Sequence, residues 1–310
     1  MAKVNVLVSL ITKDNDYQEA QAAAATTAAR ALDADLQIIY AGNDAVYQTQ
    51  QLVTVIQSAF QRPDAILVEP VGTGMPQVAT AAVTAGIGWA VLNREVDYVA
   101  RLRPTCRAPL FAVSTDQEEV GRIQGKQFAV FLKQGGSILY IEGPSAGEVS
   151  RLRASGMNST RPQNVSPKVL RGDWTETSGY RVVKSWLALS TSQQLHIGVV
   201  GCQNDAMALG ARRAFEEVPD LQARKDWLNL PFTGCDGAPG TGQEWVRRGF
   251  LAATVVIPPT MGLALEIMVQ AIRSGTQPAQ RTMSKPNSYP TIEQLIAGAV
   301  KSSAPPTTPP

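Results

Sequence analysis

The sequence predicts an α/β protein made of two lobes, each built on a doubly wound parallel sheet. Short runs rich in apolar and β-branched residues alternate with longer runs of helical pattern, which is typical of parallel sheets covered by helices on both faces. The chain has 310 residues, and single hydrophobic cores stop growing near about 250 to 300 residues. We therefore expect two lobes, one for each of two successive sets of strands.

Each predicted strand is a short apolar run, and a helical run follows most of them. The first set lies near 3–11, 35–41, 64–69, 88–92 and 110–114. The second set lies near 136–142, 167–172, 196–201, 230–235 and 251–257. Helices between them include Tyr17–Leu32, Val46–Phe60, Gln117–Lys133, Thr177–Leu189, Ala206–Glu217 and Thr260–Arg273. Residues 301–310 are rich in proline and predict a disordered tail.

The composition argues against several function classes. The chain is 44% hydrophobic and 17% charged, and its 28 basic and 26 acidic residues form no long run of one sign. We therefore expect no nucleic-acid partner. The longest weakly charged stretch is interrupted by Pro258 and Pro259, so we also expect no membrane insertion.

Common catalytic and metal-binding patterns are missing. The first predicted strand continues into SLITKDNDYQ, which has no glycine and hence neither a dinucleotide fingerprint nor a phosphate-binding loop. The three cysteines form no metal-binding pattern, and the single histidine, His196, is predicted to start a strand at the edge away from the carboxyl ends. We expect no catalytic residues, no cofactor and no metal. For Cys202 and Cys235, at the ends of neighbouring strands, either a disulfide or two free buried thiols fits the pattern.

Polar and aromatic residues stand at or just beyond the predicted strand ends. Two strings are the most informative: CQNDAMALGARRAF, with Asn204 and Asp205, and TGCDGAP, with Asp236. In a parallel sheet such side chains point into a crevice at the carboxyl edge. The other candidates are Ser9, Asn15, Tyr17, Asn93, Arg94, Arg153 and Trp174. Carboxylates, amides, guanidinium groups and flat rings together suit a sugar, whose hydroxyls form hydrogen bonds and whose C–H faces stack on aromatics.

Each candidate also has an ordinary structural explanation. Asn204 and Asp205 fit a helix N-cap, and Asp236 before a glycine fits a turn. Single arginines are commonly solvated on the surface, and Trp174 fits core packing. The shared location at strand ends favours the site, and the alternatives stay open.

Several motifs, in one order along the chain, resemble those of the ribose-type periplasmic sugar-binding proteins, which share a fold with the ligand domains of LacI-type repressors. The resemblance spans residues 3 to 295. The motifs are VLVSLI, ILVEP, VLNRE, VSTDQEEVGRIQGK, SRLRASG, RGDW, QNDAMALGARRAF, TGCDGAP and GFLAATV.

The resemblance implies two lobes joined by a three-segment hinge that close over a monosaccharide. The first lobe would comprise 1–114 and 258–284, and the second 115–257 and 285–300. Ligand contacts would come from Ser9, Asn15, Tyr17, Asn93 and Arg94 in the first lobe and from Arg153, Trp174, Asn204 and Asp236 in the second. Tyr17 and Trp174 would sandwich the ring, both arginines would donate, Asp236 would accept, and Asn204 would do both. Asp205 would mainly cap the following helix.

Three departures from the family pattern bear on the ligand. Asn93 stands where the family usually has an aspartate, Gln18 where a second aromatic is common, and Ile257 where ribose binders carry a polar amide. A hydroxyl pattern different from that of ribose is therefore expected.

The expected function is a monomeric, non-catalytic solute receptor for a monosaccharide or related polyol, which serves an ABC permease or a membrane sensor. MAKVNVLVSLI is predicted to be the first strand rather than a signal peptide, so the location is periplasmic or extracytoplasmic if a leader was removed and cytoplasmic otherwise. The alternative is the ligand-sensing domain of a LacI-type regulator that lacks its DNA-binding region. An enzyme on the same fold is a further alternative, since fold alone does not exclude catalysis.

Overall fold

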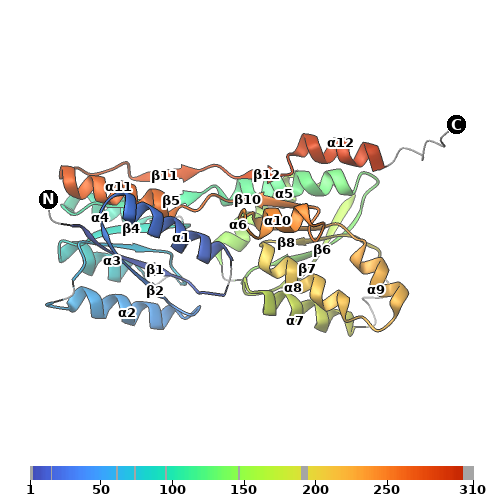
Figure 1. Ribbon diagram of the computed structural model, residues 1–310, viewed down its shortest axis with the longest axis horizontal. Helices are drawn as coiled ribbons and strands as arrows, with labels where there is room; N and C mark the ends of the chain where they lie inside the picture. The colour runs from blue at the N-terminus through green and yellow to red at the C-terminus, as the bar shows by residue number, and fades with distance from the viewer. Residues whose placement is uncertain are drawn as a thin grey trace. The chain divides into compact units, whose positions relative to one another are not determined.

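The computed structural model describes residues 3–14, 16–60, 62–72, 75–94, 96–145, 147–189 and 195–302. The chain divides into two compact units. Unit 1 comprises Met1–Thr115 and Pro258–Ser284, and unit 2 comprises Asp116–Ile257 and Lys285–Pro310. Each unit holds one sheet with helices on both faces, which confirms the predicted fold class (Figure 1).

The sheet of unit 1 has six strands in the order β11-β5-β4-β3-β1-β2, and every pair in it is parallel. The strands are β1 (Asn5–Leu10), β2 (Asp35–Tyr40), β3 (Ala65–Val68), β4 (Gly88–Leu92), β5 (Leu110–Thr115) and β11 (Arg281–Ser284). Strands β1 and β3 to β5 are almost wholly buried, as expected for parallel strands covered on both faces. Because these strands are parallel, their carboxyl ends meet at one edge.

Two layers of helices cover this sheet. The face that bears β1 residues Val6 and Val8 packs against α1 (Asp16–Ala31) and α11 (Met261–Ser274). The other face packs against α2 (Ala45–Gln57), α3 (Met75–Thr84) and α4 (Tyr98–Leu102), which a short 3-10 helix, η1 (Arg103–Thr105), follows. Helix α2 ends at Gln57 rather than at Phe60, because Ser58 takes an extended conformation while its N–H still bonds to Val55 O.

The sheet of unit 2 also has six strands, in the order β12-β10-β9-β8-β6-β7. Only β12 is antiparallel among the strand pairs of the described residues. The strands are β6 (Gly136–Glu142), β7 (Val165–Arg171), β8 (Ile197–Cys202), β9 (Phe232–Asp236), β10 (Ala253–Val256) and β12 (Asn287–Tyr289). The predicted strands of both sets are thus present, with ends that shift by a few residues.

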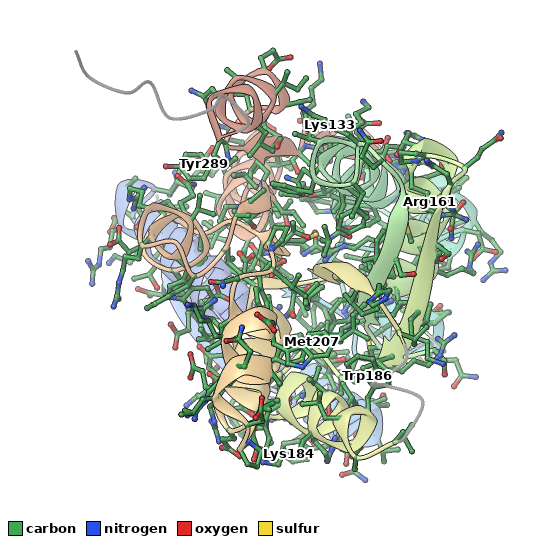
Figure 2. All side chains as sticks on the ribbon, turned by 90° about the vertical axis from the view of Figure 1, so that its right-hand side faces the viewer. Lys133, Arg161, Lys184, Trp186, Met207 and Tyr289 are labelled. Atoms are coloured by element: carbon green, nitrogen blue, oxygen red, sulfur yellow. The ribbon has the colours of Figure 1, made fainter. Side chains whose placement is uncertain are left out.

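Helices again lie on both faces of this second sheet. One face packs against α7 (Glu176–Leu187), α8 (Asp205–Glu216), α9 (Leu221–Leu228) and α10 (Gly242–Arg247), and the other against α5 (Gln117–Phe131) and α6 (Glu148–Thr160). Figure 2 looks onto unit 2: Trp186 and Met207 are buried beside the sheet, whereas Lys184 lies on the outside of α7. Helix α12 (Ile292–Ser302) contacts α5.

Two glycines fix the close approach of α5 to α6. A Cβ at Gly121 would lie 2.0 Å from the carbonyl oxygen of Arg153, and one at Gly156 would lie 1.9 Å from that of Glu118. Neither position tolerates a larger residue without a shift of the backbone. This contact matters because it places Arg153 relative to the start of α5.

Helix α12 includes residues 301 and 302, which the sequence assigned to the tail, and residues 303–310 lie outside the described residues. Within the described part of the chain, no helix has the length and apolar character needed to span a membrane.

Candidate functional site

Four predicted site residues of unit 1 stand at the carboxyl edge of its sheet: Ser9, Tyr17, Asn93 and Arg94. Tyr17 is the second residue of α1, and Asn93 directly follows β4, where it adopts a left-handed conformation with φ of 55°. Asn93 Nδ2 donates to the Tyr17 hydroxyl at 3.0 Å, and Asn93 Oδ1 accepts from Thr260 Oγ1 at 3.4 Å. The structure therefore brings Tyr17 and Asn93 into direct contact.

Ser9 and Arg94 are tied to the segment that follows β3. The fully buried Ser9 Oγ accepts from Gln48 Nε2 at 3.0 Å, and the same amide group donates to Glu69 O. Arg94 Nη2 donates to Pro70 O at 3.1 Å. The fifth predicted residue of this unit, Asn15, lies outside the described residues.

Gln18 and Glu69 form a buried pair beside these residues. Gln18 Oε1 accepts from Ile11 N at 2.8 Å, and its Nε2 donates to Glu69 Oε2 at 2.9 Å. Gln18 thus fixes the loop after β1. In the family pattern a second aromatic residue is common at this position. Sequence reasoning gave Glu69 no role, although ILVEP carries the same signal as Asp236: a carboxylate at the end of a buried strand.

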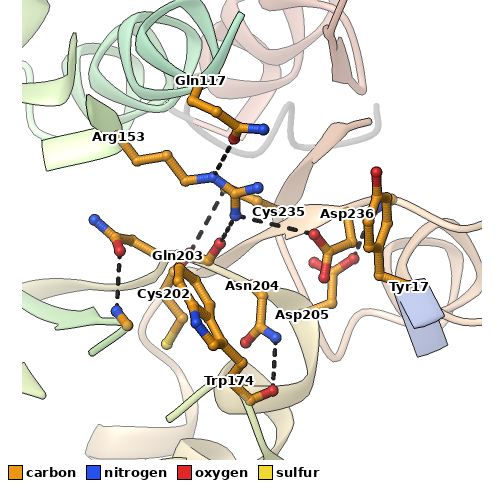
Figure 3. A network of polar contacts seen from close by, with 12 residues as sticks. Tyr17, Gln117, Arg153, Trp174, Cys202, Gln203, Asn204, Asp205, Cys235 and Asp236 are labelled. Atoms are coloured by element: carbon orange, nitrogen blue, oxygen red, sulfur yellow. Dashed lines mark hydrogen bonds and ion pairs between the residues drawn. The ribbon is translucent and has the colours of Figure 1, made fainter. Parts of the chain in front are cut away.

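In unit 2 the buried guanidinium of Arg153 is the centre of a polar cluster (Figure 3). Its Nε donates to Gln117 Oε1 at 2.9 Å and its Nη1 donates to the carbonyl oxygen of Gln203. Nη1 also lies 3.9 Å from Asp236 Oδ1, and the guanidinium carbon lies 5.5 Å from the ring centre of Trp174. Three of the predicted residues of this unit therefore meet.

Backbone strain marks two members of the cluster. Asp236 has φ of 105° and Trp174 has φ of 74°, which are unusual for residues with a side chain. The Trp174 ring lies against the backbone of Gly143, where a Cβ would come within 2.2 Å of Trp174 Cζ2. Strained residues persist where the surrounding structure over-determines them, often at ligand sites.

Asn204 is the N-cap of α8, and it also fixes Trp174. Its backbone is extended, Oδ1 accepts from Met207 N at 2.9 Å, and Nδ2 donates to Trp174 O at 2.8 Å (Figure 3). The expectation that Asp205 caps this helix is therefore wrong. A cap needs an extended backbone so that its side chain reaches the next turn, whereas Asp205 is already helical.

The sequence did not indicate the two glutamines that hold Arg153, Gln117 and Gln203. Gln203 Oε1 accepts from Gly143 N at 2.9 Å, and its Nε2 donates to Ser150 O at 2.9 Å. One residue thus connects the ends of β6 and β8 with the start of α6. Its position before Asn204 in QNDAMALG was the available signal, but glutamine alone points to no particular chemistry.

Burial raises the pKa of three groups in unit 2: Glu142, Cys202 and Cys235. Burial raises the pKa of Glu142, at the end of β6, while Arg171 at 3.1 Å acts in the opposite direction. Cys202 and Cys235 are free thiols, and burial raises the pKa of both. They are consequently poor nucleophiles.

The remaining titratable groups form no metal centre within the described ranges: no three His, Cys, Asp or Glu residues are grouped so as to hold an ion. His196 is exposed and directly precedes β8, at the edge opposite the carboxyl ends.

Each unit offers, at the carboxyl edge of its sheet, hydrogen-bonding groups beside an aromatic ring. Such a mixture binds hydroxylated molecules.

Known proteins resemble this chain over most of its length. Residues 6–279 match the family model described as periplasmic binding protein domain. A D-apiose import binding protein of Paraburkholderia graminis is 24% identical over 273 residues, which cover 86% of this chain and 80% of that protein. A xylitol-binding protein of Mycolicibacterium smegmatis is 28% identical over 251 residues, or 78% of this chain and 64% of that protein.

Solved structures share the fold. An ABC transporter solute-binding protein from Actinobacillus succinogenes with bound D-allose has a TM-score of 0.79 at 20% identity, over 94% of this chain and 99% of that one. The arabinose-binding component from Shewanella sp. ANA-3 has a TM-score of 0.77 at 21% identity, over 97% and 96% of the two chains. The family consists of binding proteins rather than enzymes, which confirms the expected function class. Since the family model matches well over half of the sequence, the chain belongs to the periplasmic binding protein domain family.

Proposed function

We propose that the chain is a solute-binding protein whose ligand is a monosaccharide or related polyol, and that it serves an ABC permease or a membrane sensor. The observation that carries this proposal is the cluster of unit 2. There Gln117 holds Arg153 beside the Asp236 carboxylate and over the Trp174 ring. Such a preformed set of donor, acceptor and flat surface is what a polyhydroxylated ring requires.

Each residue has a defined role in this proposal. Asp236 accepts hydrogen bonds from ligand hydroxyls, Arg153 donates to ligand oxygens, and Trp174 covers the C–H face of the ring. In unit 1 the Tyr17–Asn93 pair and Arg94 supply further contacts. Charge-assisted hydrogen bonds contribute roughly 1.5–3 kcal/mol each, so three or four of them account for micromolar affinity, which corresponds to about 8 kcal/mol.

The names of the relatives support the same class of ligand. They are called binding proteins for D-apiose and for xylitol, and the two solved structures hold arabinofuranose and D-allose. These molecules share several adjacent hydroxyls on a small carbon framework. The departures at Asn93 and Gln18 support a ligand other than ribose.

A thermal-shift screen over pentoses, hexoses and polyols, followed by isothermal titration, tests the proposal. We expect one compound class to raise the melting temperature and to bind with one site per chain, without product formation, because a ligand selective for the folded form stabilises it. The matched control pair is Arg153→Ala and Arg151→Ala: Arg151 lies on the same helix but is exposed. Turnover of the ligand, or equal affinity of both variants, would contradict the proposal.

The proposal also includes a monomeric state and an extracytoplasmic location. Size-exclusion chromatography with light scattering measures the former, and fractionation of cells that express the gene measures the latter. A stable oligomer or a purely cytoplasmic protein would instead favour the ligand-sensing domain of a LacI-type regulator.

A further inference from the structure

Asp205 is a fully buried carboxylate to which the proposed function gives no role. Its Oδ2 accepts from Gly237 N at 2.7 Å and its Oδ1 accepts from Thr254 Oγ1 at 2.7 Å. Asp205 begins α8 after β8, Gly237 follows β9, and Thr254 lies in β10. β8, β9 and β10 are neighbours in the sheet, so one side chain links the ends of β8 and β9 to β10.

Two glycines, which have no side chain, make room for this carboxylate. A Cβ at Gly234 would lie 2.0 Å from Asp205 Oδ1, and one at Gly242 would lie 2.0 Å from Oδ2. Both oxygens therefore fit into spaces that only glycine leaves open. The tight enclosure and the two short hydrogen bonds leave the carboxylate a single position.

The segment that Asp205 holds is the turn that carries Asp236. Asp236 has φ of 105° and Gly237 has φ of 58°. A residue with a side chain in such a region costs on the order of 1–3 kcal/mol, and it stays there only when neighbouring contacts require it. The hydrogen bond from Gly237 N to Asp205 is one such contact, and the bond from Ile257 N to Asp236 O at 2.9 Å is another.

We propose that Asp205 is a positioning residue for ligand binding: it holds the strained Asp236–Gly237 turn so that the Asp236 carboxylate faces Arg153 before the ligand arrives. This inference rests on the proposed function. Asp205 contacts the turn and not the ligand. When the binding-competent conformation is only partly populated, the apparent affinity falls by that fraction, so release of the turn weakens binding.

Two variants release the turn to different degrees. Asp205→Asn keeps the shape but removes the charge, so that Gly237 N–H can donate at best to a neutral amide oxygen while Thr254 Oγ1 must turn to accept from the new NH2 group. Thr254→Val keeps the volume and removes one of the two hydrogen bonds. We expect Kd to rise about tenfold or more for the first variant and several-fold for the second, because a hydrogen bond to a buried charge is lost.

The matched control for Thr254→Val is Thr233→Val. Thr233 is equally buried in β9, next to β10 and in register with Ala253, but its hydroxyl has no hydrogen-bond partner among the described residues. We expect Thr233→Val to bind like the wild type. A loss of affinity in both valine variants would assign the effect to core packing and overturn the proposal.

A double-mutant cycle separates positioning from a general loss of stability. Asp205→Asn and Asp236→Asn are titrated alone and together at a temperature well below both melting transitions. If Asp205 acts through Asp236, its substitution weakens binding less than about twofold once Asp236 is already replaced. Additive effects, with the full loss in both backgrounds, would overturn the proposal.

Amide exchange of Gly237 provides a readout that needs no ligand. We expect the Gly237 and Ile257 amides to exchange faster in Asp205→Asn, while the amides in the middle of β8 stay protected. Unchanged exchange at both positions would overturn the inference by itself. A wild-type protein that binds none of the screened sugars would instead overturn the proposed function, and the exchange measurement would still decide whether Asp205 holds the turn.

Discussion

The guanidinium of Arg153 faces the carboxylate of Asp236 at 3.9 Å between Nη1 and Oδ1, and both side chains are more than nine-tenths buried. Gln117 Oε1 accepts from Nε of Arg153, and the carbonyl of Gln203 accepts from the same Nη1 that faces Asp236. Groups of the protein itself thus fix the position of the guanidinium. A site preorganised in this way spends little of its binding free energy on ordering side chains.

Replacement of either charged partner should weaken ligand binding, with different effects on the empty protein. We expect Asp236→Asn to lose about 1.4 kcal/mol or more of affinity, since it keeps the shape and removes the charge. Arg153→Ala should lose at least about 2 kcal/mol and also lower the melting temperature, because it leaves a buried carboxylate without this partner. Titration calorimetry and thermal melts check both effects. An Arg153→Ala protein that melts like the wild type would contradict the structural role.

Asn93 should determine which hydroxyl pattern unit 1 accepts. Its amide donates to Tyr17 and accepts from Thr260, so Asn93→Asp replaces a donor by an acceptor and adds a charge. We expect the order of affinities across the sugar panel to change, with at least about tenfold loss, or 1.4 kcal/mol, for the best wild-type ligand. The control is Asn43→Asp, an exposed site that also has a positive φ. An unchanged order of affinities would exclude Asn93 from selectivity.

The strand positions and the strand-end residues could be predicted from the sequence because both depend on local pattern. Runs such as ILV before Glu69 and GVVGC before Gln203 are buried on both faces, so their apolar character is continuous. Parallel pairing then brings the polar ends to one edge. The meeting of Arg153 with Asp236 follows from this rule together with the glycine contact between α5 and α6.

Other features of the fold and the site depend on details that local sequence patterns do not encode. Whether Asn204 or Asp205 caps α8 depends on a shift of one residue in the helix start, and helix boundaries are uncertain by more than that. Gln117 and Gln203 show no periodic signal, because their roles arise only when α5 and β8 are packed together. Strands β11 and β12 are short and include polar residues, and so they escape a search for apolar runs.

Glu142 should make the free energy of unfolding depend on pH. Burial raises its folded-state pKa above the ordinary value of 4.5, so the folded protein binds this proton more tightly than the unfolded chain. The resulting stabilisation is fully present below pH 4.5 and is lost as the pH rises through the folded-state pKa. We expect the wild type minus Glu142→Gln difference in unfolding free energy, measured by urea titration, to fall with pH in this window. A difference that rises with pH would show that Arg171 outweighs burial.

Gly143→Ala should disable the stacking surface without touching any polar group of the site. The new methyl would lie 2.2 Å from Cζ2 of Trp174, and Gly143 has no positive φ that would strain an alanine. We therefore expect the ring to move and the affinity to fall by about 0.5–1.5 kcal/mol, the range for aromatic contacts. Titration calorimetry measures the loss, and tryptophan fluorescence reports the displaced ring.

The matched control for this substitution is Gly240→Ala, in the loop after β9, where an added Cβ would meet nothing within 4 Å. It should bind like the wild type. A cycle with Trp174→Leu then tests the mechanism: if the new methyl acts only by displacing the indole, Gly143→Ala costs little further affinity once the indole is absent. A full second loss in that background would mean that Gly143 contributes through its backbone, whose N–H donates to Gln203 Oε1 at 2.9 Å, rather than through the space it leaves for Trp174.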